Sequence, residues 1–185
     1  MGYSFKTFLK HTAKDFHNQS VNPPVVRAST IIFKSIQDIR KTQNKYKKDP
    51  RGGYFDYGRQ GTSTTHILQK ILSKLEESYH VFLTPTGFGS VFLGLFSILR
   101  PGNEILISDP VYSPTRILAQ DYLNEYNIKT TFYNPHDINS LKEKINKNTK
   151  LIFVENPGSN TFEFQDLSKI ISIAKKNKIF TAMDN

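Results

Sequence analysis

Hydrophobic and polar residues follow a regular pattern along most of the chain from residue 64 onward. Between Thr64 and Glu77 the apolar residues fall at positions 67, 68, 71, 72 and 75, which is the spacing of one helical face. Short apolar runs bounded by turn residues predict buried strands, and longer periodic segments predict helices. The predicted strands are Tyr79–Leu83, Glu104–Ile107, Lys129–Tyr133, Leu151–Val154 and Lys178–Met183, and the predicted helices are Thr64–Glu77, Phe88–Leu99, Thr115–Tyr126, Ile138–Asn146 and Asp166–Asn177.

This alternation of strands and helices indicates the fold class. Strands separated by helices of about ten to fourteen residues favour a parallel sheet covered on both faces. We therefore predict an α/β domain with a mainly parallel sheet at residues 54–185, preceded by an N-terminal arm at residues 1–53. The arm is polar and contains Pro23-Pro24, one apolar run at Val25–Phe33 and a short helical stretch at Ser35–Thr42.

The composition excludes several classes of protein. Hydrophobic residues make up 37% of the chain and aromatic residues 12%, which is enough for a packed core. The chain has no cysteine, so disulfides, thiolate catalysis and cysteine-ligated zinc are excluded. The five histidines show no metal-ligand spacing. Because no apolar run approaches the length of a membrane span or of a signal peptide, we expect a cytoplasmic protein without membrane contact.

The formal net charge of +9 raises the alternative of nucleic-acid binding. The basic residues gather in one polar segment, predicted as a loop, that contains Arg40, Lys41, Lys45, Lys47, Lys48 and Arg51. That segment offers only Tyr46 as a stacking aromatic, and lysine and asparagine are in excess along the whole chain. A solvated basic surface is therefore the favoured interpretation, and binding to nucleic acid the rival one.

The segment Thr84–Ser90, with the sequence Thr-Pro-Thr-Gly-Phe-Gly-Ser, is a candidate anion site. It joins a predicted strand to a predicted helix, so the backbone N–H groups at the helix N-terminus face one point. Gly87 allows close approach of a ligand to the backbone. The glycines do not fit the dinucleotide fingerprint or the phosphate loop of nucleotide-binding proteins, and a plain tight turn is the alternative.

Further polar residues follow the ends of other predicted strands. Tyr112 lies just after a strand, where its ring could stack on a planar ligand, and Glu155–Ser159 form a polar turn after another. Asp184 follows the last apolar run, at the edge where open α/β sheets bind ligands. Arg59 lies in a glycine-rich segment and can present a bidentate fork to phosphate.

In chain order, these segments supply a phosphate cradle, a stacking aromatic ring, a hydrogen-bonding turn and a carboxylate. That combination suits a planar, phosphorylated, heteroaromatic cation. Pyridoxal 5′-phosphate (PLP) is such a ligand, because its ring nitrogen needs an anionic partner to stay protonated.

Three motifs carry a resemblance to a known family. They are Val-Asn-Pro-Pro-Val-Val-Arg-Ala-Ser-Thr at 21–30, Tyr-Gly-Arg-Gln-Gly-Thr at 57–62, and Asn-Pro-Gly-Ser at 156–159. They resemble the Cys/Met-metabolism family of PLP-dependent enzymes of fold type I, and within it the cystathionine β-lyase branch. The match runs from about residue 20 to the last residue.

The resemblance implies roles for seven residues. Gly87 and Phe88 would bind the cofactor phosphate through backbone amides, and Tyr112 would stack on the pyridine ring. Asp184 would hold the ring nitrogen, and Ser159 would lie near the ring hydroxyl. Tyr57 and Arg59 would reach the phosphate bound by a neighbouring subunit, which implies a homo-oligomer, a dimer-based tetramer by family. Asn156 stands where the lyase pattern has serine, and Phe88 is bulkier than in many relatives.

The resemblance also implies the reaction: β-elimination of cystathionine to homocysteine, pyruvate and ammonia, in methionine biosynthesis. The family's Schiff-base lysine would follow the Asp184-Asn185 pair, so the resemblance implies that these 185 residues are the N-terminal portion of such an enzyme, with an incomplete PLP-binding domain at residues 54–185. We expect no catalytic residue within them and no normal turnover from them alone. The enzymatic alternative is a γ-synthase or γ-lyase of the same family, whose Asn-Pro is replaced here by Asn160-Thr161. A degenerate or nucleic-acid-binding protein is the non-enzymatic alternative.

Overall fold

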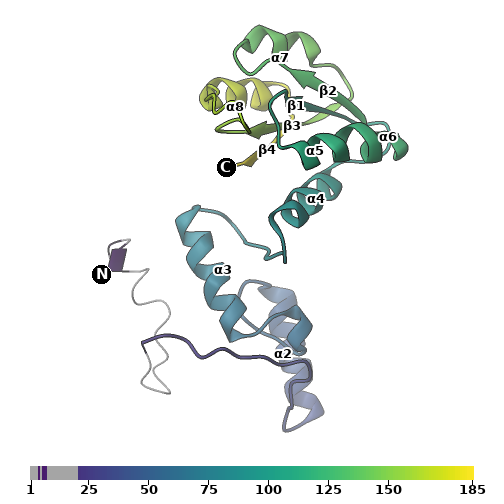
Figure 1. Ribbon diagram of the computed structural model, residues 1–185. Helices are drawn as coiled ribbons and strands as arrows, with labels where there is room; N and C mark the ends of the chain where they lie inside the picture. Colours follow the sequence, from purple (N-terminus) through teal and green to yellow (C-terminus); the bar gives the residue numbers. More distant parts are fainter. Residues whose placement is uncertain (1–3, 5, 8–20) are drawn as a thin grey trace. The chain divides into compact units, whose positions relative to one another are not determined.

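The computed structural model describes Ser4, Lys6, Thr7 and residues 21–185, so most of the first twenty residues of the predicted arm, including His11 and His17, lie outside the described residues. The chain forms two compact units, unit 1 at Met1–Leu83 and unit 2 at Thr84–Asn185 (Figure 1). None of the helices in the described parts is long and apolar enough to cross a membrane.

Unit 1 is built on two helices, α2 (Ile36–Lys48) and α3 (Ser63–Leu75), with the short 3₁₀ turn η1 (Gly58–Gln60) between them. The Ser35 side chain caps α2 by accepting from the N–H of Asp38, and Thr62 begins α3 with a capping box. The prediction of a helix at 64–77 is confirmed. The helix predicted at 35–42 extends to Lys48, so the basic cluster lies mainly on α2 and not in a loop, as we had expected.

The strand predicted at Tyr79–Leu83 is wrong, because this segment has no strand partner and runs as an irregular connection. Its backbone is held by side chains of α3: the Gln69 amide donates to the Val81 carbonyl at 2.8 Å, and the Ser73 hydroxyl donates to the Ser78 carbonyl at 2.7 Å. Phe82 remains 73% exposed. The apolar run is therefore not a buried strand.

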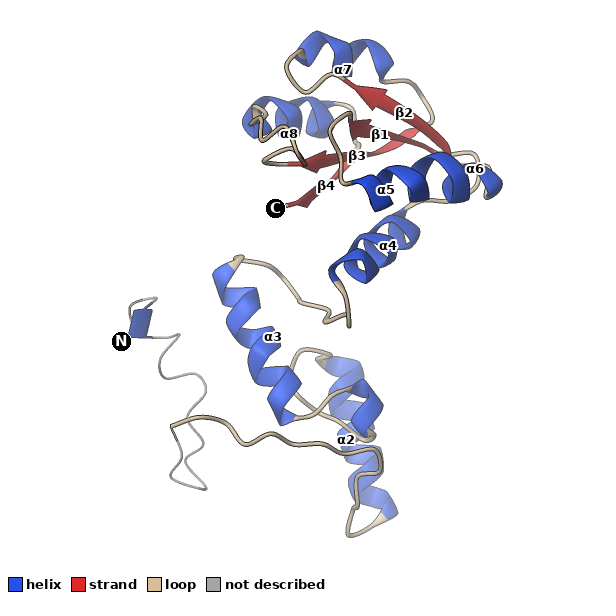
Figure 2. Cartoon of the chain, viewed as in Figure 1, coloured by secondary structure: helices blue, strands red, loops and turns tan. Residues whose placement is uncertain are grey.

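Unit 2 contains a parallel four-stranded sheet in the order β2-β1-β3-β4, which confirms the predicted fold class (Figure 2). The strands are β1 (Glu104–Ser108), β2 (Lys129–Tyr133), β3 (Thr149–Glu155) and β4 (Phe180–Asp184), all close to the predicted ranges. The helices are α4 (Gly87–Ile98), α5 (Ser113–Ile117) with its continuation through the π-helical turn η2 (Leu118–Tyr122) and α6 (Leu123–Glu125), α7 (Ile138–Lys144) and α8 (Leu167–Lys176).

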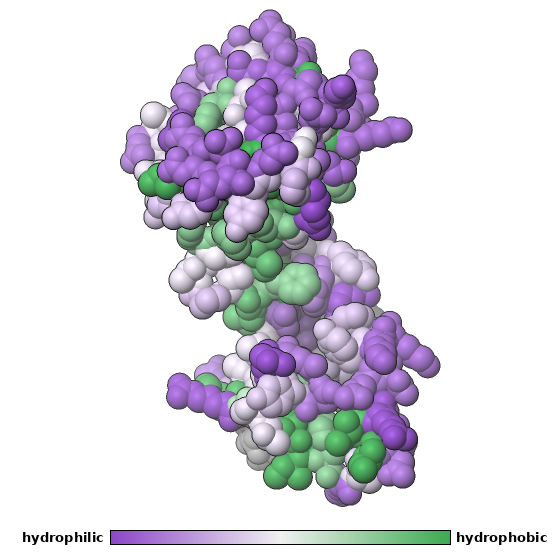
Figure 3. Space-filling model, turned by 90° about the vertical axis from the view of Figure 1, so that its right-hand side faces the viewer, coloured by the Kyte–Doolittle hydropathy of each residue, from purple (hydrophilic) through white to green (hydrophobic). Residues whose placement is uncertain are grey.

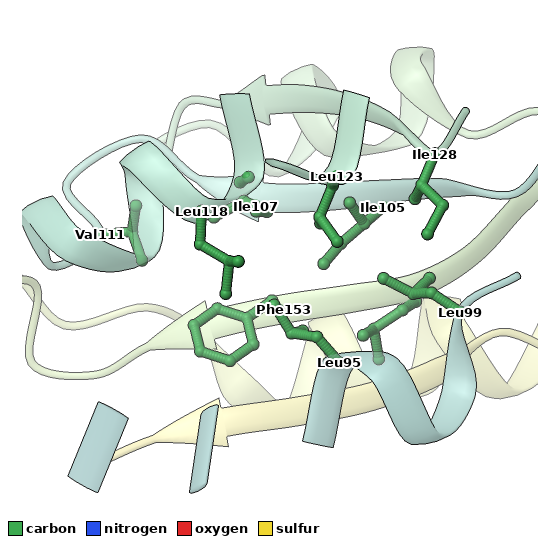
Figure 4. Close-up of a cluster of buried hydrophobic side chains, with 11 residues drawn as sticks. Leu95, Leu99, Ile105, Ile107, Val111, Leu118, Leu123, Ile128 and Phe153 are labelled. Atoms are coloured by element: carbon green, nitrogen blue, oxygen red, sulfur yellow. The ribbon is translucent and has the colours of Figure 1, made fainter. Parts of the chain in front are cut away.

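Two hydrophobic clusters hold the sheet between layers of helices. Alternate residues of β1 face opposite sides, so Ile105 and Ile107 join one cluster and Leu106 joins the other. On the first side Leu95 of α4 and Phe153 of β3 lie in one cluster with Leu118 and Leu123 of the α5–α6 segment (Figure 4). The second cluster packs α7 and α8 on the opposite face. The central strands β1 and β3 are buried on both faces, which explains why they read as apolar runs.

Helix α4 carries apolar side chains on its exposed side as well as on the side that faces the sheet. Phe92 is 46% exposed and Leu93 48% exposed, and the Phe92 and Phe96 rings stack with centroids 4.4 Å apart. The space-filling view shows hydrophobic side chains gathered at the height of α4 (Figure 3).

Candidate active site

A cavity of about 360 Å³ lies within unit 2 where the N-terminus of α4 meets the carboxyl ends of β3 and β4. It is lined by Gly87 and Ser90 from α4, Phe153 from β3, and Ala182 and Asp184 from β4, among others. Parallel strands present their carboxyl ends at one edge, which is the usual ligand-binding edge of open α/β sheets. The structure thus brings Gly87 and Asp184, ninety-seven positions apart in the sequence, to one cavity, which we call the Gly87–Asp184 pocket.

The N-terminus of α4 offers hydrogen-bond donors at this pocket. The Thr86 hydroxyl caps the helix by accepting from the Gly89 N–H at 3.0 Å, and the Thr86 carbonyl accepts from the Ser90 N–H at 3.2 Å. Among the described residues, the N–H groups of Gly87 and Phe88 have no acceptor. The space beside Gly87 is open, with nothing within 4 Å of where a Cβ would stand. Two unpaired N–H groups at a helix N-terminus attract an anion.

Tyr112 is tied to β3 by a short hydrogen bond. Its backbone N–H donates to the Glu155 carboxylate at 2.6 Å, although the two residues are far apart in the sequence. The Tyr112 side chain itself is 47% exposed. Four residues later, Arg116 bonds the carboxylate and the carbonyl of Asp109, which closes the loop between β1 and α5. Glu155 therefore fixes the backbone from which the Tyr112 ring projects.

Glu155 is the most electrostatically perturbed carboxyl group at this edge of the sheet. Burial raises its pKa above the usual range, the Tyr112 N–H and the Ser159 hydroxyl lower it, and the nearby Asp184 and Glu163 carboxylates raise it again. Glu155 and Asp184 are register partners on β3 and β4, which places the two carboxylates side by side. The sequence showed Glu155 only as part of a polar turn, and its bond to Tyr112 depends on tertiary register.

The turn after β3 is held by a second set of hydrogen bonds. The Asn156 side chain accepts from the Gln165 N–H at 2.7 Å, and the Gln165 amide donates to the Glu155 carbonyl at 3.0 Å. The buried Tyr133 hydroxyl donates to the Gln165 side chain at 2.8 Å. Ser159 is placed by its own N–H, which donates to the Pro110 carbonyl at 2.9 Å and so brings the turn against the loop that carries Tyr112.

Glu163 lies behind this turn and was not singled out by the sequence. Both of its carboxylate oxygens are buried, and neither has a hydrogen-bond partner among the described residues. The carboxylate occupies the space where a side chain at position 158 would begin, so any larger residue at Gly158 would displace the Glu163 side chain. No sequence signal marked Glu163, because its burial depends on the fold of the turn.

Tyr57 and Arg59 lie in unit 1, next to the strand-like segment that contains Ser29 and Thr30. Tyr57 forms a β-bridge with Thr30, and its hydroxyl accepts from the Ser29 hydroxyl at 2.9 Å. The Arg59 guanidinium lies 5.3 Å from the centre of the Tyr57 ring. Gly58 is fixed by sterics, since an added Cβ would stand 1.8 Å from the Ala28 carbonyl oxygen. This geometry holds Tyr57 and Arg59 together on one turn.

No metal centre competes with this interpretation in the described part of the chain. Groups of three or more His, Cys, Asp or Glu side chains suited to hold a metal ion are absent from the described residues. The site chemistry is therefore that of hydrogen-bond donors at α4 and of carboxylates at the ends of β3 and β4.

Comparisons with known proteins identify the family of the chain. The family model of Cys/Met metabolism PLP-dependent enzymes matches residues 6–185. The chain is 34% identical over 172 residues to the L-alanine/L-glutamate racemase of Wolbachia pipientis, covering 90% of this chain and 42% of that protein. It is 32% identical over 176 residues to the cystathionine beta-lyase of Haemophilus influenzae, covering 94% of this chain and 43% of that protein.

Solved structures show the same fold. The cystathionine gamma synthase of Xanthomonas oryzae pv. oryzae, crystallised in complex with cystathionine, is similar with a TM-score of 0.85 at 24% identity. That similarity covers 100% of this chain and 45% of the other. The chain thus spans less than half the length of these relatives.

Proposed function

The chain belongs to the family of Cys/Met metabolism PLP-dependent enzymes, and we propose that the protein acts as a carbon–sulfur lyase on cystathionine. The proposed reaction removes the Cα proton, breaks the Cβ–S bond and consumes one water, and it yields homocysteine, pyruvate and ammonia. The observation that carries the proposal is the Gly87–Asp184 pocket, where the N-terminus of α4 and the Asp184 carboxylate meet in one cavity and the N–H of Gly87 has no acceptor among the described residues.

The residues of this pocket fit PLP. The open space beside Gly87 and the unpaired N–H groups of Gly87 and Phe88 suit the phosphate, and Asp184 suits the protonated ring nitrogen. When bound, PLP supplies an electron sink that acidifies the Cα proton of an amino-acid substrate. Phe88 contributes through its backbone, so its bulk does not disturb this role.

Tyr112 and Ser159 complete the proposed cofactor site. We assign the exposed Tyr112 ring to stacking on the pyridine and the Ser159 hydroxyl to a polar contact near the ring hydroxyl. The support is that both residues lie on loops tied to the end of β3, Tyr112 through Glu155 and Ser159 through Pro110.

Tyr57 and Arg59 are proposed to bind the cofactor phosphate held by a second copy of the chain. The support is their common turn in unit 1, which presents a phenol and a guanidinium within one short segment. The proposal requires a homo-oligomer. Within it, residues 54–185 would form the cofactor-binding domain and residues 1–53 the N-terminal arm.

The choice of β-elimination over other reactions of the family rests on the turn after β3. Asn160-Thr161 follows Ser159 where the γ-synthase and γ-lyase branches are expected to have Asn-Pro. The racemase relative makes racemisation the second candidate, because racemisation also begins with removal of the Cα proton. A γ-lyase and a racemase would each differ from the proposed lyase in their products.

Product analysis tests the proposal. The protein is purified from its native source, supplied with PLP and incubated separately with cystathionine and with L-alanine. The proposed lyase releases pyruvate and homocysteine from cystathionine. Formation of α-ketobutyrate from cystathionine would identify a γ-lyase instead. Formation of D-alanine from L-alanine, with no pyruvate from cystathionine, would identify a racemase.

A further inference from the structure

Unit 1 contains a cavity of about 520 Å³ to which the proposed lyase reaction assigns no role. One wall is a face of α3, where His66, Lys70 and Lys74 recur every four residues, and the opposite wall is the irregular segment that contains Tyr79. Arg51 closes one end. The volume falls in the range of small-molecule sites, roughly 300 to 1,000 Å³.

The walls of this cavity are held in place by hydrogen bonds within unit 1. The bonds from Gln69 to Val81 and from Ser73 to Ser78 fasten the irregular segment along α3. Because both donors are side chains of the same helix, the segment that carries Tyr79 is fixed relative to Lys70 and Lys74. The cavity is therefore a built feature of unit 1.

Arg51 is held with part of its guanidinium free. Its Nη1 donates to the Tyr79 carbonyl at 3.3 Å, its Nε lies 3.7 Å from an oxygen of Asp49, and the guanidinium lies 4.2 Å from the centre of the Tyr79 ring. These contacts fix the plane of the side chain and leave Nη2 without a partner among the described residues. A guanidinium fixed in this way is ready to bind an oxyanion.

The charges around the cavity are mainly positive. Arg51, Lys70 and Lys74 face a single acidic lining residue, Glu77. Within the described parts of the chain, no carboxylate lies within ion-pair distance of Lys70 or Lys74. Burial lowers the pKa of His66, and the Lys70 ammonium lowers it further, so the imidazole is neutral at pH 7 and can donate one N–H.

We propose that this cavity, lined by Arg51, His66, Lys70 and Lys74, is a binding site for a small phosphorylated or polyphosphate anion. Such a ligand supplies the anionic partner that Lys70 and Lys74 lack among the described residues. The volume is larger than one phosphate group needs, so the ligand is a phosphorylated small molecule or a short polyphosphate. The proposal does not depend on the lyase assignment, because every lining residue belongs to unit 1.

Titration with sodium tripolyphosphate tests the site. The chain is compared with a Lys70→Gln/Lys74→Gln variant and with a Lys175→Gln/Lys176→Gln control, which removes the same charge from the exposed end of α8. Glutamine keeps a helix propensity close to that of lysine, and circular dichroism verifies that both variants fold. Removing two ion pairs with the ligand is expected to weaken binding roughly tenfold in the Lys70/Lys74 variant and to leave the control within about twofold.

A second measurement reports the site directly in the unmodified chain. The His66 imidazole resonances are followed by NMR against pH, with and without tripolyphosphate. An anion beside Lys70 offsets the charge that depresses the His66 pKa, so that pKa is expected to rise on binding. An unchanged His66 titration at saturation would overturn the proposal.

Two other outcomes would also overturn it. Equal weakening in the Lys70/Lys74 variant and the Lys175/Lys176 control would mean that only the net charge matters. Binding of a single-stranded oligonucleotide without binding of tripolyphosphate would assign this surface to nucleic acid.

Discussion

Replacement of Glu155 separates the role of its hydrogen bond from the role of its charge. Glu155→Leu removes the acceptor of the Tyr112 N–H, which then lies partly buried without a partner. An unsatisfied buried N–H costs about 1–3 kcal/mol, and partial burial places this one near the lower half of that range. For a unit of about one hundred residues, each kcal/mol lowers the melting temperature by roughly 4–8 °C. At about pH 5, where ionisation of Glu155 costs the folded protein least, we expect Glu155→Leu to lower the melting temperature of unit 2 by about 4–16 °C, and at about pH 8 by less because Leu also removes that charge.

Glu155→Gln keeps the acceptor and removes the charge. Because the folded state raises the pKa of Glu155, ionisation in the folded protein lowers its stability as pH rises upward from the ordinary value of 4.5. Glutamine does not ionise, and its amide can donate to the neighbouring Asp184 or Glu163 carboxylate. The Gln variant is therefore expected to match or exceed the native chain in stability at neutral pH, with a smaller advantage near pH 5.

Thermal unfolding followed by circular dichroism at about pH 5 and about pH 8 measures both effects. The reasoning is refuted if Glu155→Gln is destabilised as much as Glu155→Leu at the higher pH. It is also refuted if Glu155→Leu melts at the same temperature as the native chain at about pH 5, because the Tyr112 N–H would then have found another acceptor.

Three further substitutions test other parts of the structure. Burial alone raises the pKa of Glu104, but hydrogen bonds from Thr131 and Asn146 and the Lys129 ammonium lower it overall. Its contribution to stability is therefore present above pH 4.5 and lost as pH falls through the lowered pKa. Glu104→Ala leaves Thr131 and Asn146 without their carboxylate acceptor, while the Lys129 ammonium is already mostly exposed, so it should cost about 2 kcal/mol in urea unfolding at pH 7 and less at about pH 3. Gly58→Ala forces a Cβ against the Ala28 carbonyl, so hydrogen exchange at the neighbouring β-bridge should accelerate, whereas exchange in unit 2 stays unchanged. Gly87→Ala meets no atom within 4 Å, so the melting temperature should hold within about 2 °C while PLP binding weakens; an unchanged affinity for PLP would remove Gly87 from the phosphate site.

The pattern of apolar residues predicted the sheet of unit 2 well, but it predicted helix α2 and the segment Tyr79–Leu83 of unit 1 poorly. The segments that became β1 and β3 read as continuous apolar runs because both of their faces are covered by helices. Tyr79–Leu83 is equally apolar but has no neighbouring strand, and a short run cannot reveal whether a partner exists. Helix α2 was underestimated because its residues are mostly lysine, arginine and glutamine, which favour helices without marking an apolar face.

The candidate site was predictable where it depends on local sequence. Gly87 and Asp184 lie at element ends that the pattern of turns and runs already defined, and the structure places both in one pocket. The bond between Tyr112 and Glu155 and the buried carboxylate of Glu163 depend on how distant loops meet, which no local pattern records.

The central claim is that the N-terminus of α4 holds the phosphate of PLP, and amide NMR of the ¹⁵N-labelled chain tests it most directly. PLP is added and compared with pyridoxal, which lacks the phosphate. We predict that the Gly87 and Phe88 amide resonances shift saturably with PLP and remain in place with pyridoxal, because both N–H groups have no acceptor among the described residues. Equal shifts with both compounds, or no shift at Gly87 and Phe88 with PLP, would contradict it.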